Sequence, residues 1–129
     1  MRWVVRCLLI GCGGKTGGGK PAPTDDVGKC DTGDGEACTK LAVANEPNIA
    51  QTRGNAPLAF AYYKKACTAK SWKGCVGLAR LHEYGIGTPR DSVAAAKHFE
   101  LACSHDDAGG CWSRARMYHQ WLRGCNPAS

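Results

Sequence analysis

Residues 59–79 read AFAYYKKACTAKSWKGCVGLA, and this stretch contains a cysteine pair, Cys67 and Cys75, with seven residues between its members. The same C-x7-C spacing recurs, in steps of 37 and 36 residues, at two further pairs: Cys30/Cys38 and Cys103/Cys111. A period of this length is typical of stacked helix-hairpin repeats. A cysteine pair in phase with the period suggests one disulfide in each repeat, and disulfides indicate an oxidising compartment.

The residues on both sides of the pairs have helical periodicity. After the second cysteine, Cys75, Leu78 and Ala79 follow the spacing i, i+3, i+4, which places them on one helix face. The equivalent residues one repeat earlier are Cys38, Leu41 and Ala42. Before the first cysteine, a second helical set is matched 36 residues later: Ala59/Tyr63/Ala66 and Ala95/Phe99/Ala102. Each repeat is therefore expected to contain two helices.

These patterns predict an all-α solenoid of helix hairpins, about two and a half repeats long. The five expected helices span residues 36–45, 55–67, 72–84, 91–103 and 108–122. Asn55 and Asp91 have the side chains that favour helix N-caps, and Gly85 and Gly87 mark a turn after the third helix. No helix is expected before Cys30, which would lie on a short stub.

The motif Tyr62-Tyr63-Lys64-Lys65-Ala66-Cys67, followed by Gly74-Cys75-x-x-Leu78-Ala79 and the Gly85-x-Gly87 turn, resembles the Sel-like repeat family. The resemblance covers roughly residues 28–122 and implies α/α repeats related to tetratricopeptide repeats. The cysteine phase is similar to that of the secreted, cysteine-rich branch, in which each repeat carries a disulfide. The first repeat departs from the pattern because it lacks the glycine turn, and the last has Arg114 where Leu41 and Leu78 stand.

The N-terminal segment resembles a lipoprotein signal. Residues 1–12 (MRWVVRCLLIGC) have a positive start, an apolar run and a lipobox-like ending, in which Cys12 would be lipidated. Against this interpretation, the segment is short and Arg6 interrupts its apolar run. We expect a flexible linker over 13–27, a repeat domain over 28–124 and a tail over 125–129. The expected location is the bacterial cell envelope, periplasmic or on the outer membrane, with secretion as the alternative.

Charge and hydropathy limit the classes of partner. The formal net charge is +6, but Lys and Arg are scattered, without the dense basic stripe typical of nucleic-acid binding. No apolar run is long enough for a membrane-spanning helix, so a membrane would be contacted only through a lipid anchor.

Zinc is the main rival explanation for the cysteines. Structural zinc sites favour ligands two to four residues apart, which the C-x7-C pairs do not match, and the four His share no ligand-type spacing. We therefore expect disulfides, with no metal and no cofactor. If Cys7 is removed with the signal and Cys12 is lipidated, Cys125 is left over. It would be a free thiol, an intermolecular bridge or, without cleavage, a partner of Cys12.

The predicted function is that of a non-catalytic scaffold for a protein or peptide ligand. Four residues on the expected 72–84 and 108–122 helices are candidates for partner contact: Arg80, His82, Arg116 and Tyr118. Trp112 is expected to pack in the core. The alternative, which rests on family resemblance, is a β-lactamase-like hydrolase or penicillin-binding protein. The compact acid/base cluster His105-Asp106-Asp107 is the candidate for catalysis, although Asp107 would more simply cap the following helix.

Overall fold

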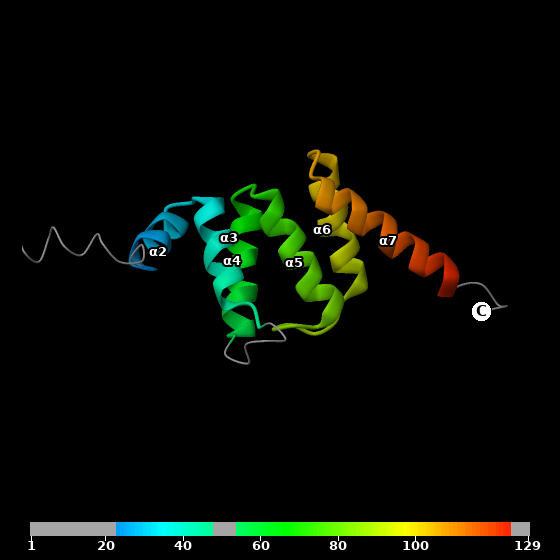
Figure 1. Ribbon diagram of the computed structural model, residues 1–129, viewed down its shortest axis with the longest axis horizontal. Helices are drawn as coiled ribbons and strands as arrows, with labels where there is room; N and C mark the ends of the chain where they lie inside the picture. Colours follow the sequence, from blue (N-terminus) through cyan, green and yellow to red (C-terminus); the bar gives the residue numbers. More distant parts are fainter. Residues whose placement is uncertain (1–22, 48–53, 125–129) are drawn as a thin grey trace, which may run out of the picture.

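The computed structural model describes residues 23–47 and 54–124, and these ranges contain a row of helices that pack side by side along the molecule (Figure 1). The helices are α2 (Pro23–Asp31), α3 (Gly35–Asn45), α4 (Ala56–Thr68), α5 (Trp72–Tyr84), α6 (Ser92–Ser104) and α7 (Ala108–Gly124). We call α3, α5 and α7 the A helices and α2, α4 and α6 the B helices. The predicted lipobox with Cys12, most of the predicted linker and Cys125 lie outside the described residues.

The all-α solenoid is confirmed, and the five predicted helices are present with bounds within two residues of those expected. Helix α3, with 11 residues, is shorter than α5, with 13: α3 ends at Asn45 with Glu46 as its C-cap, without the glycine that ends α5. The caps also agree: the side chain of Asn55 accepts from the Leu58 N–H, and that of Asp91 accepts from the Val93 and Ala94 N–H groups.

Helix α2 was not predicted, and the expectation of a stub before Cys30 is wrong. Its nine residues include 23–27, the end of the predicted linker, where the composition offers little apolar surface to bury. The helix has Asp25 and Asp26 in its first turn and Lys29 in its last, the arrangement that the helix dipole favours. Val27 packs against the cluster around Cys30 and Cys38, which gives this short helix a tertiary anchor.

Each disulfide joins a B helix to the A helix that follows it. The bonds are Cys30–Cys38, Cys67–Cys75 and Cys103–Cys111, with Cα–Cα distances of 4.7, 4.5 and 4.4 Å. Three residues after the first cysteine, the backbone turns in the left-handed region, with φ of 101° at Gly33, 63° at Lys70 and 62° at Asp106. The next residue in each case is polar and caps the A helix: Asp34, Ser71 and Asp107. The link is therefore the same local structure built three times.

The core is built mainly from alanine and cysteine, which lets the helices approach closely. Ala42, Ala59, Ala66 and Ala79 are all 0% exposed. Gly77 of α5 also allows a close approach: a Cβ added to this residue would collide with the Tyr63 ring of α4. The A helices also contact each other directly, α3 with α5 and α5 with α7, so they form a continuous layer. In the described ranges, no helix is long and apolar enough to span a membrane.

Candidate functional site

Arg80, the first of the candidate contact residues, lies on α5 and pairs with the end of α3. Its Nη2 is 2.9 Å from Oε1 of Glu46, and the Tyr63 hydroxyl donates to Oε2 of the same carboxylate at 2.9 Å. Burial raises the pKa of Tyr63, and the neighbouring Glu46 carboxylate raises it further. The guanidinium of Arg80 remains half exposed. Arg80 therefore joins two repeats while its outer edge remains open to solvent.

Arg116 repeats this arrangement between α7 and α5. Its Nη2 is 2.7 Å from Oε2 of Glu83, a side chain that is only 7% exposed. The hydrogen bond to Glu83 raises the pKa of Arg116. The guanidinium carbon also lies 5.6 Å from the centre of the Trp112 ring, within the range of a cation–π contact. The equivalent acidic residues, Glu46 and Glu83, are 37 positions apart, and this spacing is the signal in the sequence that points to the two ion pairs.

His82 is half-buried between two B helices. Its ring meets Phe60 of α4 edge-on at 5.3 Å and stacks on His98 of α6 at 5.7 Å. Burial lowers the pKa of His98, with a further lowering by His82. His82 Nδ1 is buried and has no hydrogen-bond partner among the described residues. Most of the His82 surface is therefore used inside the stack.

Tyr118 belongs to a set of exposed aromatic rings on α7. Tyr118 and Trp121 are 63% and 62% exposed, and their ring centres lie 6.3 Å apart. Trp112, which we expected in the core, is 68% exposed, so that expectation is wrong. Its equivalent on α5, Val76, is covered in part by α6, whereas no described helix lies over the same face of α7.

A groove of about 610 Å³ runs between α6 and α7, beside these rings. Its apolar lining is supplied mainly by Val93, Ala96, Met117 and Trp121. Arg114 and Glu100 also line the groove and lie 3.8 Å apart. In Figure 1, α7 runs away from α6 toward its C-terminal end.

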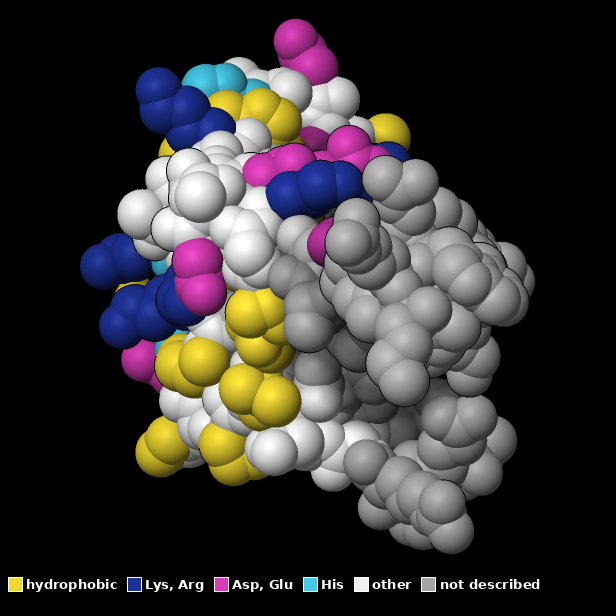
Figure 2. Space-filling view, turned by 90° about the vertical axis from the view of Figure 1, so that its left-hand side faces the viewer, with side chains coloured by type: hydrophobic (Ala, Val, Ile, Leu, Met, Phe, Trp, Pro, Cys, Tyr) yellow, Lys and Arg dark blue, Asp and Glu magenta, His cyan; other side chains and the backbone are white. Residues whose placement is uncertain are grey.

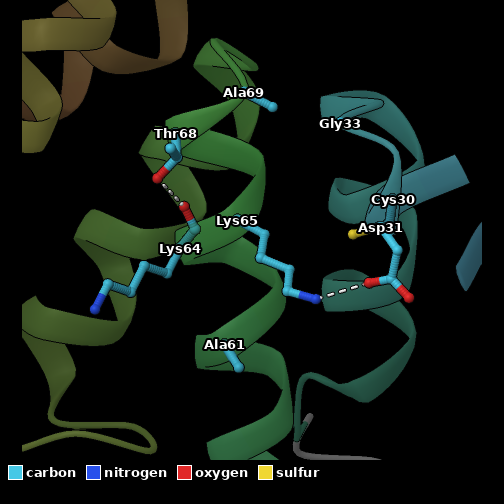
Figure 3. A pocket seen from close by; sticks show the side chains of 8 residues that line it. All are labelled: Cys30, Asp31, Gly33, Ala61, Lys64, Lys65, Thr68 and Ala69. Carbon is cyan, nitrogen blue, oxygen red and sulfur yellow. Dashed lines mark hydrogen bonds and ion pairs between the residues drawn. The ribbon is translucent and has the colours of Figure 1, made fainter.

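A second depression, of about 630 Å³, lies between α2 and α4 at the other end of the stack. Figure 3 shows Lys65 reaching from α4 toward α2, where its Nζ is 2.8 Å from Oδ1 of Asp31. The exposed surface at this end has acidic and basic side chains next to each other, with hydrophobic ones gathered below them (Figure 2). This end therefore differs from α7, whose charged residues are all arginines.

The acid/base cluster of the hydrolase hypothesis is engaged in local structure. The ring of His105 stacks on Trp72, with centres 3.7 Å apart and planes 2° apart. Asp107 caps α7, because its carboxylate accepts the Gly110 N–H at 2.8 Å. Asp106 is the left-handed residue of the link. Across residues 23–47 and 54–124, no group of three or more His, Cys, Asp and Glu is placed to hold a metal ion.

Comparison with known proteins agrees with this repeat geometry. The family model described as Sel1 repeat matches residues 35–71 and 72–107, together more than half of the chain. The two matches begin at the first residues of α3 and α5, so each covers one A helix and the following B helix. A curated relative, cytochrome c oxidase assembly factor 7A of Xenopus laevis, is 29% identical over 85 residues. That alignment covers 64% of this chain and 37% of the relative, so the chain spans little more than a third of the relative's length.

Proposed function

Because this chain belongs to the Sel1 repeat family, we propose that it is a non-catalytic scaffold that binds a protein or peptide. Sel1 repeats generally mediate protein–protein interaction. Stacked helix repeats present extended surfaces in which one row of helices is available to a partner. The A helices form such a row here, and they carry all four residues that we selected for partner contact.

The observation that carries this proposal is the exposure of three aromatic rings on α7. Trp112, Tyr118 and Trp121 are each more than 60% exposed, and Arg116 lies over one of them. Tyr, Trp and Arg are the residues most enriched at the energetic centres of protein interfaces. Exposure of this much aromatic surface on a single helix supports a protein ligand over a small polar substrate.

The name of the relative also supports this proposal. That protein is named as an assembly factor of cytochrome c oxidase, so its name refers to other proteins. We draw from it only the class of ligand, a protein, and not the identity of the assembly.

The three disulfides indicate an oxidising, extracellular-type environment for the folded domain. We propose that the chain is exported and tethered by a lipid on Cys12, with release into the medium as the alternative. Metabolic labelling with an alkyne fatty acid tests the tether: the label should be incorporated by the natural chain and lost with Cys12→Ala.

The binding function is tested by affinity capture of the full chain from its source cells, followed by quantitative mass spectrometry. We expect at least one protein to be retained by the natural chain and to be depleted by Tyr118→Ala and by Trp121→Ala. Leu101→Ala is the matched control, since Leu101 is an exposed apolar residue of α6, outside the α6–α7 groove. Equal recovery with all variants would contradict a binding surface on α7.

A further inference from the structure

We propose that the exposed face of α7 binds an amphipathic helix of a partner protein, in the position that a B helix takes on each preceding A helix. The partner helix presents small and aromatic residues to α7 and carries acidic residues at its edges. This inference rests on the proposed binding function and specifies its ligand.

The alanines of the A helices show that this face is left uncovered. Ala42 of α3 packs in one cluster with Ala59 and Tyr63 of α4, and it is 0% exposed. Ala79 of α5 packs with Ala95 and Phe99 of α6, and it is also 0% exposed. Ala115 is the equivalent residue of α7, and it is exposed. The same helix face is thus covered by a B helix twice and remains open on α7.

The groove beside this face differs from its equivalent one repeat earlier. Between α4 and α5, Phe60 contacts His82, which in turn stacks on His98 of α6, so that space is closed. Between α6 and α7 the corresponding residues are Ala96 and Tyr118, and both line the open groove of about 610 Å³. Helix α6 closes the space between α4 and α5. By analogy, a further helix is the element that fits the groove between α6 and α7.

Helix α7 also ends differently from α5. Gly85, with φ of 70°, ends α5 and allows Ile86 to fold back onto the core around Leu81. Trp121 occupies the equivalent position on α7, where the helix continues to Gly124. No described residue of α7 therefore folds back over the surface that is equivalent to the one covered by Ile86 on α5.

The residues that B helices bury define the face expected on the partner. In α4 these are Ala59, Tyr63 and Ala66, and in α6 they are Ala95, Phe99 and Ala102, none more than 2% exposed. The shared spacing is Ala-x3-aromatic-x2-Ala, which puts three residues on one helix face. A partner helix with this spacing can approach Ala115 as closely as α6 approaches Ala79.

The charge of α7 indicates the flanks of the partner helix. Helix α7 contains Arg114, Arg116 and Arg123 and no Asp or Glu. Arg116 is held by Glu83 at 2.7 Å, whereas Arg114 is 3.8 Å from Glu100 and its side chain is 55% exposed. Arg114 is therefore positioned to meet an acidic partner residue. Opposite charges around an apolar contact increase the association rate and select the partner. Acidic residues at the edges of the docked helix are therefore expected.

A second copy of this chain fits the surface poorly. Its helices α4 and α6 have the required spacing, but they already bury it in their own core. Its α2, the first described B helix, has Asp26 and Lys29 where α4 has Tyr63 and Ala66. The inter-repeat ion pair would also be missing, because the last repeat has His119 in place of Glu83 and the first has Val43 in place of Arg80.

The test uses a fluorescein-labelled peptide of residues 91–104 with the changes Lys97→Glu and Cys103→Ala, added to the full-length protein. This probe keeps Ala95, Phe99 and Ala102 and has acidic residues at 91, 97 and 100. We expect saturable binding by fluorescence anisotropy. Two control peptides are used, one with Phe99→Glu and one that keeps the natural Lys97 and carries Asp91→Lys and Glu100→Lys. Each should bind at least about tenfold more weakly.

Matched protein variants locate the site. Ala115→Glu should weaken binding of the acidic peptide about tenfold or more, and Ala44→Glu, the same change at an exposed alanine of α3, should leave it within about twofold. Binding that is absent, or that is equally affected by both variants, would overturn the proposal. So would a dimer in sedimentation experiments that Ala115→Glu dissociates. A cellular partner that depends on Trp121 but does not compete with the peptide would overturn the helix assignment and leave the proposed binding function standing.

Discussion

Glu83 and Arg116 form an ion pair of 2.7 Å that repeats, one helix hairpin later, the 2.9 Å pair of Glu46 and Arg80. Both pairs join consecutive A helices, and the two acidic residues stand at equivalent positions, as do the two arginines. The pairs differ in burial, since Glu83 is 7% exposed and Glu46 is 17% exposed. They therefore set the spacing of the A helices with unequal contributions to stability.

This difference predicts unequal effects of removing each arginine. Arg116→Met leaves the buried Glu83 carboxylate without its partner, and the free energy of unfolding should fall by about 2–3 kcal/mol. Arg80→Met leaves Glu46 with the Tyr63 hydroxyl and more solvent, so the loss should be about 1 kcal/mol or less. Urea unfolding followed by circular dichroism measures both. Equal losses would show that burial of the carboxylate does not decide the contribution.

The disulfides should contribute much of the stability of a core this rich in alanine. Each closes a loop of about nine residues, which corresponds to about 2.5 kcal/mol in the chain-entropy model. Replacing Cys67 and Cys75 together by Ser should lower the melting temperature by about 10 °C or more. Replacing Cys125 by Ser is the control. Reduction of all three disulfides in the natural chain should lower the melting temperature more than the removal of any one of them. A melting temperature that is insensitive to reductant would contradict this expectation.

Stability should decrease on mild acidification because of the stacked histidines. The folded protein holds His98 at a pKa below its usual value, so the unfolded chain binds a proton more readily at this residue. The free energy of unfolding is then highest above about pH 6.5 and falls as the pH drops from there through the lowered pKa of folded His98. Urea titrations at several pH values measure the slope.

His98→Gln should flatten this pH dependence, whereas His119→Gln, at an exposed residue of α7, should preserve it. A slope that is unchanged by His98→Gln would assign the effect to other groups.

The contact between Gly77 and Tyr63 should tolerate no added methyl group. In Gly77→Ala the new Cβ collides with the Tyr63 ring, and the buried ring has little room to move, so we expect a loss of about 1–3 kcal/mol. Gly28→Ala is the control, because nothing lies within 4 Å of its Cβ position and alanine favours the α2 helix. Gly28→Ala should stabilise the protein slightly. A neutral Gly77→Ala in chemical unfolding would show that helices α4 and α5 can separate at low cost.

The hydrolase hypothesis predicts turnover of a chromogenic cephalosporin, and we expect none. His105 is stacked on Trp72, and the Asp107 carboxylate is used as a helix cap. Turnover by pure protein that disappears with His105→Ala and with Asp106→Ala would reverse this expectation.

The sequence by itself determined five of the six helices in the described ranges, together with the links and the cysteine pairing. These features depend on residues within about ten positions of one another: a capping Asp or Ser, a cysteine eight residues away, and apolar residues at helical spacing. Helix α2 was missed because its own apolar content is low, and its stability depends on Val27 packing against the neighbouring cluster. Local composition there favoured a linker, and tertiary contact decided otherwise.

Only the tertiary structure decided which side chains are used inside the stack and which are exposed. Arg80 and Arg116 meet carboxylates 34 and 33 positions away, a distance along the chain that no local pattern reports. Trp112 and Ala115 are equivalent to the partly buried Val76 and the buried Ala79 of α5, yet they are exposed because no described helix packs over them. Burial depends on what lies across a face, and the residues of that face do not encode whether it is covered.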